Sequence, residues 1–180
     1  MTLTNSEKIG EKVVQRALRL GASSAEAFFT KNKELSIDVS DQQVETMKLA
    51  EQQGLGIRVL RNQKLGFAYT SDLTDSALEQ AVQQAVANSD NTEKDQYHSL
   101  PRPASYAQLS LYDPNISRTP VEKKIELAKE IERIARNFDP RVKITERCSY
   151  VDSIYEVAVV NSLGVKGSYE GAYCGAYSLL

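Results

Sequence analysis

The sequence predicts an α+β fold, in which a mainly antiparallel sheet carries helices on one face. Two kinds of segment support this prediction. Segments with helical apolar spacing begin at helix-capping residues, and the segments between them alternate apolar and polar residues, as half-buried strands do. The expected order is helix, four strands and helix, then a linker, then helix and three strands. The expected divisions are residues 1–90, a linker or long loop over 91–118, and a second unit over 119–180.

The first helix and the helix before the linker have clear local signals. Thr4 and Glu7 stand three residues apart as a capping box, and Gly21 is expected to end the first helix. Thr74 is expected to cap the second. The apolar face of that second helix consists of Leu78, Ala81, Val82, Ala85 and Val86. Both helices are therefore expected to cover one side of the sheet.

The residues between these helices predict an antiparallel meander. "ELSIDVS" alternates apolar and polar residues, and "GLGIRVLRNQKLGFAYT" does so twice. The polar residues between the last two runs predict a tight turn around Asn62 and Gln63. "EAFFTK" and "QVETMKLA" complete the four expected strands.

The second half repeats the order of helix and strands. Thr119 is expected as helix cap, Pro120 as the first helical residue and Glu122 as the capping-box acid. The next strand is predicted by apolar residues of one parity, which are Val142, Ile144, Cys148 and Tyr150. Gly164 in "NSLG" suits the left-handed position of a hairpin loop before the last strand.

The last strand, "YEGAYCGAYSLL", places Tyr169, Tyr173 and Tyr177 on one face with two glycines between them. A helix is disfavoured because two interior glycines would cost it about 2 kcal/mol. The tyrosine face is either core or a wall that contacts a peptide or partner protein. The ending has no turn, cap or polar tail, so we expect the chain to be a fragment that is cut within a strand.

Composition excludes some classes of function. The chain has 180 residues and a net charge of −2, without a dense run of Lys or Arg, so direct nucleic-acid binding is not expected. No apolar run is long enough to span a membrane and no secretory signal is evident, so a cytoplasmic protein is expected. Cys148 and Cys174 are then expected to be buried and reduced, with a disulfide between adjacent strands as the alternative.

The sequence contains no recognisable catalytic or metal centre. A helical zinc site needs two histidines and a catalytic triad needs one, but His98 is the single histidine and lies in a polar, proline-flanked stretch. A hydrolase that uses His98 is the weakest hypothesis, and an exposed loop residue is expected instead. Acid pairs are expected to lie on solvated faces; these are Glu130 with Glu132 and Asp38 with Asp41.

Two stretches carry a resemblance to a known family. Residues 51–90 contain a G-x-G-x-R-V strand, a polar turn, "GFAYT" and then "SDLT" opening a helix, and residues 159–180 contain a strand pair around an N-S-x-G turn. These features resemble the N-terminal domain of the TldD/PmbA (TldE) proteins, also named modulators of DNA gyrase. The "GFAYTSDL" form is closer to the PmbA/TldE branch.

The resemblance implies a cytoplasmic metallopeptidase assembled from TldD-type and PmbA-type subunits. It implies that the TldD-type subunit supplies zinc through an H-E-x-x-x-H helix and that unfolded peptides are cleaved in an enclosed chamber. Maturation of a peptide antibiotic and degradation of an antitoxin are associated roles. This chain would then contribute to hetero-oligomer formation or self-association and to substrate enclosure, with no zinc ligand of its own. Tyr169, Tyr173 and Tyr177 are the candidate contact residues. The alternative is a non-catalytic adaptor for gyrase or a toxin–antitoxin partner.

Overall fold

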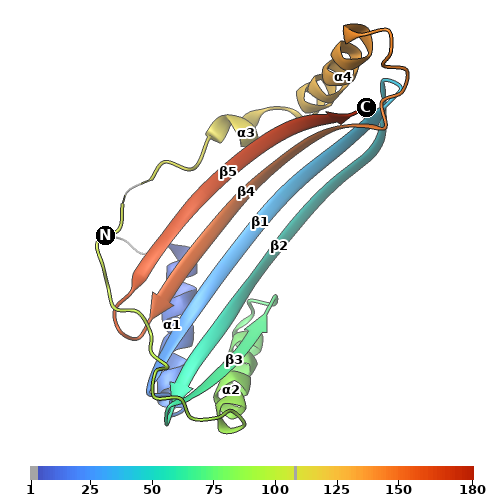
Figure 1. Ribbon diagram of the computed structural model, residues 1–180. Coiled ribbons are helices and arrows are strands. Elements are labelled where there is room, and N and C mark those ends of the chain that lie inside the picture. The colour runs from blue at the N-terminus through green and yellow to red at the C-terminus, as the bar shows by residue number, and fades with distance from the viewer. Residues whose placement is uncertain (1–3, 108) are drawn as a thin grey trace. The chain divides into compact units, whose positions relative to one another are not determined.

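The computed structural model describes residues 4–107 and 109–180, and it confirms the predicted α+β fold (Figure 1). The helices are α1 (Asn5–Arg19), α2 (Asp75–Asp90), α3 (Pro114–Arg118) and α4 (Val121–Phe138). The strands are β1 (Ser24–Ser40), β2 (Gln43–Arg61), β3 (Lys64–Thr70), β4 (Arg147–Asn161) and β5 (Lys166–Leu179). They form one five-stranded sheet in the order β3-β2-β1-β4-β5, so β5 is an outermost strand.

The chain folds into two compact units. Unit 1 consists of Met1–Lys31, Gln52–Leu109 and Glu156–Tyr169. Unit 2 consists of Asn32–Glu51, Ser110–Tyr155 and Glu170–Leu180. The four long strands β1, β2, β4 and β5 each contribute residues to both units. Helices α1 and α2 belong to unit 1, and α3 and α4 belong to unit 2.

Local signals in unit 1 act as the sequence predicts. The Thr4 hydroxyl accepts a hydrogen bond from the Glu7 N–H at 3.3 Å, and the Glu7 carboxylate accepts one from the Thr4 N–H at 2.9 Å. Thr74 caps α2. Asn62 and Gln63 have φ angles of 52° and 65°, so two successive left-handed residues form the turn between β2 and β3.

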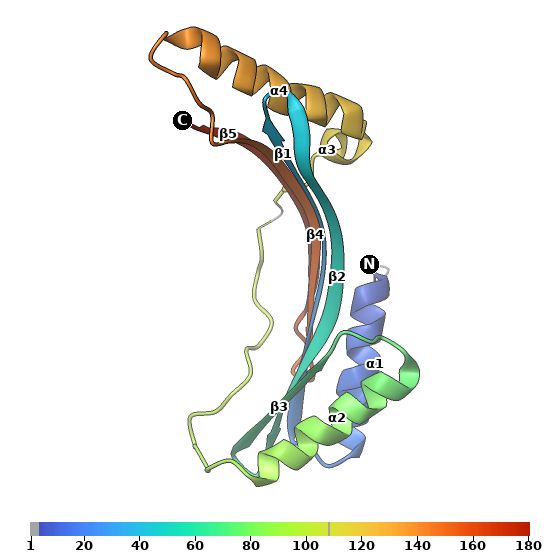
Figure 2. The ribbon, with the colours of Figure 1, turned by 90° about the vertical axis from the view of Figure 1, so that its right-hand side faces the viewer.

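The core of unit 1 is apolar and covered by two helices. Figure 2 shows α1 and α2 on the same side of the strands of this unit. The predicted apolar face of α2 is buried, as are Val13 and Ala17 of α1 and Ile57 of β2. Gly66 of β3 permits close contact with α2, because a Cβ atom there would lie 1.9 Å from the Ala85 carbonyl oxygen. Apolar burial is therefore what holds these helices to their strands.

The core of unit 2 is smaller and covered by α4. Its buried apolar cluster contains Leu35, Ile37, Val39, Ala128 and Tyr150, with Ile125 packed against it. A second two-residue turn joins β1 to β2, where Asp41 and Gln42 have φ angles of 49° and 58°. Within unit 2, α4 thus packs on one face of β1 and β4 and leaves the opposite face without a helix (Figure 2).

The strands before α2 are fewer and longer than expected. β1 joins the predicted runs "EAFFTK" and "ELSIDVS", and β2 joins "QVETMKLA" and "GLGIRVL". The polar residues between the runs contain no proline, and main-chain pairing in a strand does not require apolar side chains. Polar residues alone therefore do not end a strand.

The start of α4 differs from the prediction. Val121 is its first residue and Pro120 is its N-cap without a side-chain hydrogen bond, while the Thr119 hydroxyl donates to the Asn115 carbonyl at 2.7 Å. Thr119 is instead the C-cap of α3, a short helix within the predicted linker. Its hydroxyl can reach the Asn115 carbonyl because Asn115 lies one helical turn earlier. Likewise, Val142 and Ile144 precede the first residue of β4 and are not part of a strand.

Candidate functional site

The tyrosines of β5 lie on a surface and not in the core. In unit 2, Tyr173 is 53% exposed and Tyr177 is 51% exposed. Successive strand side chains alternate between faces, and Ser178 accepts a hydrogen bond from the thiol of the buried Cys148 at 3.3 Å. Cys174 lies next to the hydroxyl of Tyr150, whose ring packs against α4. Tyr173 and Tyr177 therefore face away from α4.

Tyr169 lies in unit 1 and is 49% exposed. Half-exposure of all three rings makes the core alternative wrong for the described chain. Their role as contact residues stays a prediction. Within unit 2, Gly171 lies under the Tyr155 ring, because a Cβ atom at Gly171 would approach that ring to 2.3 Å. The missing side chain at Gly171 therefore leaves room for the Tyr155 ring next to β5.

The main chain of β5 has an open edge in unit 2. The Leu179 carbonyl accepts a hydrogen bond from the Glu146 N–H at 2.9 Å, so the main-chain groups of Leu179 point toward β4. Because these groups alternate in direction along a strand, those of Cys174, Ala176 and Ser178 point outward. β5 is the last strand of the sheet on this side.

A segment of the chain already pairs with one end of this edge. Leu111 forms an isolated parallel bridge with Gly171, and its carbonyl accepts a hydrogen bond from the Ala172 N–H at 2.9 Å. Asp113 then caps α3, so the chain continues as a helix after Leu111 and not as a strand along β5. The sequence gives little sign of this contact, because Leu111 belongs to a stretch without periodicity.

The two edges of the sheet in unit 2 differ in charge. Residues 43–51 of β2 include Glu45, Lys48 and Glu51, and charged residues on an edge strand discourage pairing with other strands. Residues 171–180 contain no charged residue and no proline. The β5 edge therefore lacks the usual protection against pairing with another extended chain.

A buried ion pair holds α4 to β4. The Lys124 ammonium donates to the Asp152 carboxylate, and both side chains are 7% exposed. The Tyr150 hydroxyl donates to the same carboxylate oxygen at 2.9 Å, and the Lys124 ammonium lies 5.8 Å from the centre of the Tyr150 ring. Burial raises the pKa of Tyr150, and the bond to Asp152 raises it further, so the phenol stays protonated.

Glu132 is fully buried, which corrects the prediction that it lies on a solvated face. Its carboxylate accepts hydrogen bonds from the N–H groups of Asp41 and Gln42 at 2.9 and 2.7 Å, and from the Thr145 hydroxyl at 2.7 Å. Burial raises the pKa of Glu132, but the hydrogen bonds from Thr145, Gln42 and Asp41 outweigh it and leave the pKa below its ordinary value. The carboxylate thus fastens α4 to the turn between β1 and β2.

The two cysteines and the histidine are the remaining reactive side chains among the described residues. Both cysteines are free, with Cys148 buried and Cys174 exposed, so the expectation that both are buried is wrong for Cys174. His98 is an exposed loop residue, as predicted, and its Nε2 lies 3.6 Å from Asp95. Among residues 4–107 and 109–180, no group of three or more His, Cys, Asp or Glu side chains could hold a metal ion. The described residues therefore do not fit a zinc site.

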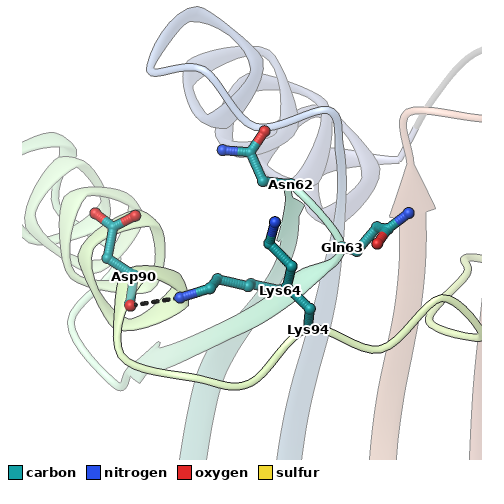
Figure 3. Close-up of a pocket in the computed structure, with 5 residues that line it drawn as sticks. All are labelled: Asn62, Gln63, Lys64, Asp90 and Lys94. Atoms are coloured by element: carbon teal, nitrogen blue, oxygen red, sulfur yellow. Dashed lines mark hydrogen bonds between the residues drawn. The ribbon is translucent and has the colours of Figure 1, made fainter.

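Unit 1 has an open polar pocket of about 450 Å³ next to the turn between β2 and β3 (Figure 3). It is lined by Asn62, Gln63, Lys64, Asp90 and Lys94. The Lys64 ammonium donates a hydrogen bond at 2.9 Å to the Asp90 carbonyl at the end of α2. One of the two lysines of the pocket is therefore a contact to the C-terminus of a helix.

No helix within the described ranges is long and apolar enough to cross a membrane. Among the described residues, the uncharged edge and the tyrosine face of β5 in unit 2 are the best-defined candidate binding surfaces.

Two family models match the chain. The model described as PmbA/TldA metallopeptidase domain 1 matches residues 25–89, and the model of the central domain of the same family matches residues 114–179. Together they account for more than two thirds of the chain. The metalloprotease PmbA homolog of Haemophilus influenzae is 32% identical over 160 residues, which cover 87% of this chain and 35% of that protein.

Solved structures share the fold. A protein described as a modulator of DNA gyrase from Bacteroides thetaiotaomicron matches with a TM-score of 0.88 and 21% identity over 99% of this chain and 41% of that one. TldE from Thermococcus kodakarensis matches with a TM-score of 0.84 and 18% identity over 93% of this chain and 38% of that one. The chain thus spans about two fifths of the length of these proteins.

Proposed function

Because this chain belongs to the PmbA/TldD metallopeptidase family, we propose that it forms the N-terminal part of a cytoplasmic peptidase subunit and serves in subunit association and in enclosure of unfolded peptides. The zinc ligands then come from a TldD-type partner subunit. In this role the chain holds substrate and performs none of the bond-breaking chemistry.

The observation that carries the proposal is the unprotected edge of β5 in unit 2. An extended peptide can add to a sheet edge through main-chain hydrogen bonds, which every residue except proline can form. Cys174, Ala176 and Ser178 direct their main-chain groups to this edge. Binding of this kind suits unfolded chains of many sequences, because it requires an extended backbone and few particular side chains.

The half-exposed rings of Tyr173 and Tyr177 add contact area beside this edge. Tyrosine presents a large apolar surface with only two side-chain torsions to immobilise, and its hydroxyl stays in contact with water. Alternate side chains of a bound peptide would lie on the same face as these rings. We therefore expect a preference for apolar or aromatic residues at alternate peptide positions.

A peptide-binding titration tests the proposal. The probe is a fluorescein-labelled peptide of alternating Val and Thr with lysines at both ends, and the readout is its fluorescence anisotropy. The double variant Tyr173→Ala/Tyr177→Ala is expected to bind about tenfold more weakly, since truncating an aromatic contact costs on the order of 1–2 kcal/mol. Tyr97→Ala is the control, because Tyr97 is an exposed tyrosine in unit 1. Equal affinity of the double variant and the unmodified chain would contradict the proposal.

Cleavage separates this proposal from an adaptor role. The labelled peptide is incubated with the chain, with a TldD-type subunit that carries the H-E-x-x-x-H helix, and with both. The peptidase role predicts faster cleavage with both proteins than with the TldD-type subunit alone. Binding to the chain with no effect on cleavage would favour the adaptor.

A further inference from the structure

The chain covers one end of the β5 edge in unit 2 with its own residues. The Leu111 carbonyl accepts a hydrogen bond from the Ala172 N–H at 2.9 Å, and Leu111 forms a parallel bridge with Gly171. Gly171 is buried and Ala172 is partly exposed, whereas residues 173–177 are all exposed. We call residues 110–112 the strap. The strap therefore takes the place that the end of an added strand would occupy.

The strap ends where α3 begins. The Asp113 carboxylate accepts a hydrogen bond from the Asn115 N–H at 2.9 Å and caps this helix, whose first residue is Pro114. Proline has no N–H to donate to a neighbouring strand. The chain therefore cannot continue its pairing along β5 past Ala172.

Few contacts hold the strap in place. None of residues 109–118 is buried. Leu111 is 42% exposed and Tyr112 is 36% exposed, and the Tyr112 hydroxyl lies 3.1 Å from the Ser117 hydroxyl of α3. Segments with few buried contacts separate from a fold at a low cost in free energy. The strap can therefore leave the β5 edge while the core of unit 2 stays folded.

We infer that the strap closes one end of the β5 edge, so that an added strand has to displace it to reach Ala172. The inference rests on the proposed function, in which a peptide adds to this edge. Main-chain direction repeats at every second residue of a strand, so Cys174, Ala176 and Ser178 share the outward direction of Ala172 and lie beyond the strap. A short peptide can pair with these three residues alone. The strap thus inhibits the binding of longer peptides and sets the end of the site.

Leu111→Pro opens the closed end without a change in β5. The N–H and C=O groups of a strand residue point to the same side, so the Leu111 N–H faces β5 as its carbonyl does. Proline removes this N–H and places its ring against the strand. Tyr106→Pro is the matched control, because Tyr106 is an exposed residue of the same connection and belongs to unit 1. Circular dichroism verifies that both variants are folded.

A titration with two peptides tests the inference. Both are fluorescein-labelled peptides of alternating Val and Thr; the short one has about seven residues, enough to pair along residues 173–179, and the long one has about eleven. The long peptide is expected to bind Leu111→Pro about tenfold more tightly than the unmodified chain, because Ala172 then offers two further main-chain hydrogen bonds. The short peptide is expected to bind both chains equally. Tyr106→Pro is expected to behave as the unmodified chain with both peptides.

Amide hydrogen exchange without peptide gives a second readout. The Ala172 N–H is expected to exchange about tenfold faster in Leu111→Pro than in the unmodified chain, and the Cys174 N–H to exchange equally fast in both. Equal affinity of the long peptide for the two chains overturns the inference. An equal gain for the short peptide, or fast exchange of Ala172 in the unmodified chain, also overturns it. If neither peptide binds any chain but Leu111→Pro still exposes Ala172, the closed end stands and the proposed function alone fails.

Discussion

The two units attach helices to their strands by different means. In unit 1 the face of the strands is covered by α1 and α2, and the contact is apolar, with Val13, Ile57 and Val82 fully buried. In unit 2 a single helix is fixed by Lys124 and Glu132 through charge-assisted hydrogen bonds. Apolar packing favours many similar arrangements, whereas paired buried charges accept few. Unit 2 therefore sets the position of α4 with buried charges and leaves the rings of Tyr173 and Tyr177 half-exposed.

The largest expected effect comes from breaking the ion pair of unit 2. Lys124→Met leaves the Asp152 carboxylate buried without its cation, and we expect a loss of about 3–5 kcal/mol in the free energy of unfolding. In Lys124→Met/Asp152→Leu both charges are absent, so we expect stability close to that of the unmodified chain. The contact between α4 and β4 is then apolar, as the contacts of α1 and α2 are in unit 1. Urea unfolding followed by circular dichroism measures both. A double variant as unstable as the single one would show that the ion pair is needed for more than charge balance.

The second effect is the acid sensitivity of unit 2. Because the folded-state pKa of Glu132 lies below its ordinary value, the carboxylate stabilises the fold above its unfolded-state pKa, and this contribution is lost as the pH falls through the folded-state pKa. Glu132→Gln is expected to cost about 1–3 kcal/mol at pH 7 and to have less pH dependence below about pH 4.5. Glu130→Gln, on the same helix and half-exposed, is the control. Parallel stability curves for Glu132→Gln and the unmodified chain would rule out this account.

The third effect tests close packing in unit 1. Gly66→Ala places a methyl group 1.9 Å from the Ala85 carbonyl oxygen and forces β3 and α2 apart, with an expected cost of about 1–3 kcal/mol. Gly175→Ala is the matched change in unit 2, where the nearest atom is 3.9 Å away. We expect that variant to be neutral or stabilised by up to about 1 kcal/mol. Thermal unfolding measures the stability of both variants. A larger loss of stability in Gly175→Ala than in Gly66→Ala would contradict the prediction.

The smallest effect is expected at the tyrosine face. Tyr177→Ala is expected to change the free energy of unfolding by no more than about 0.5 kcal/mol, because half of the ring is exposed. A loss above about 2 kcal/mol would show that Tyr177 stabilises the fold like a core residue. Urea unfolding of Tyr177→Ala measures its role in stability, and the peptide titration measures its role in binding.

Local features of unit 1 could be predicted from the sequence. The capping box of Thr4 and Glu7, the Asn62–Gln63 turn and the apolar face of α2 depend on residues within about two helical turns of one another. The structure confirms each of them. Such features follow from short-range geometry, so one chain without relatives is enough to identify them.

The buried charges of unit 2 could not be predicted in this way. Glu132 lies in a helix rich in charged residues, and its partner Asp41 is 91 positions away in the sequence. In the same helix Lys124 is buried, whereas Leu127, Ile134 and Phe138 are exposed. The contacts that decide which face of α4 is buried join residues far apart in the sequence. Local sequence patterns therefore do not predict them.

The most direct test of the central claim is amide hydrogen exchange along β5, measured by NMR with and without the alternating Val and Thr peptide. We expect the N–H groups of Cys174, Ala176 and Ser178 to exchange freely in the unbound chain and to become protected when the peptide binds. The N–H groups of residues 43–51, at the charged edge of unit 2, are expected to be unaffected. Binding of the peptide with no protection at these three positions of β5 would contradict the claim that this edge holds extended polypeptide.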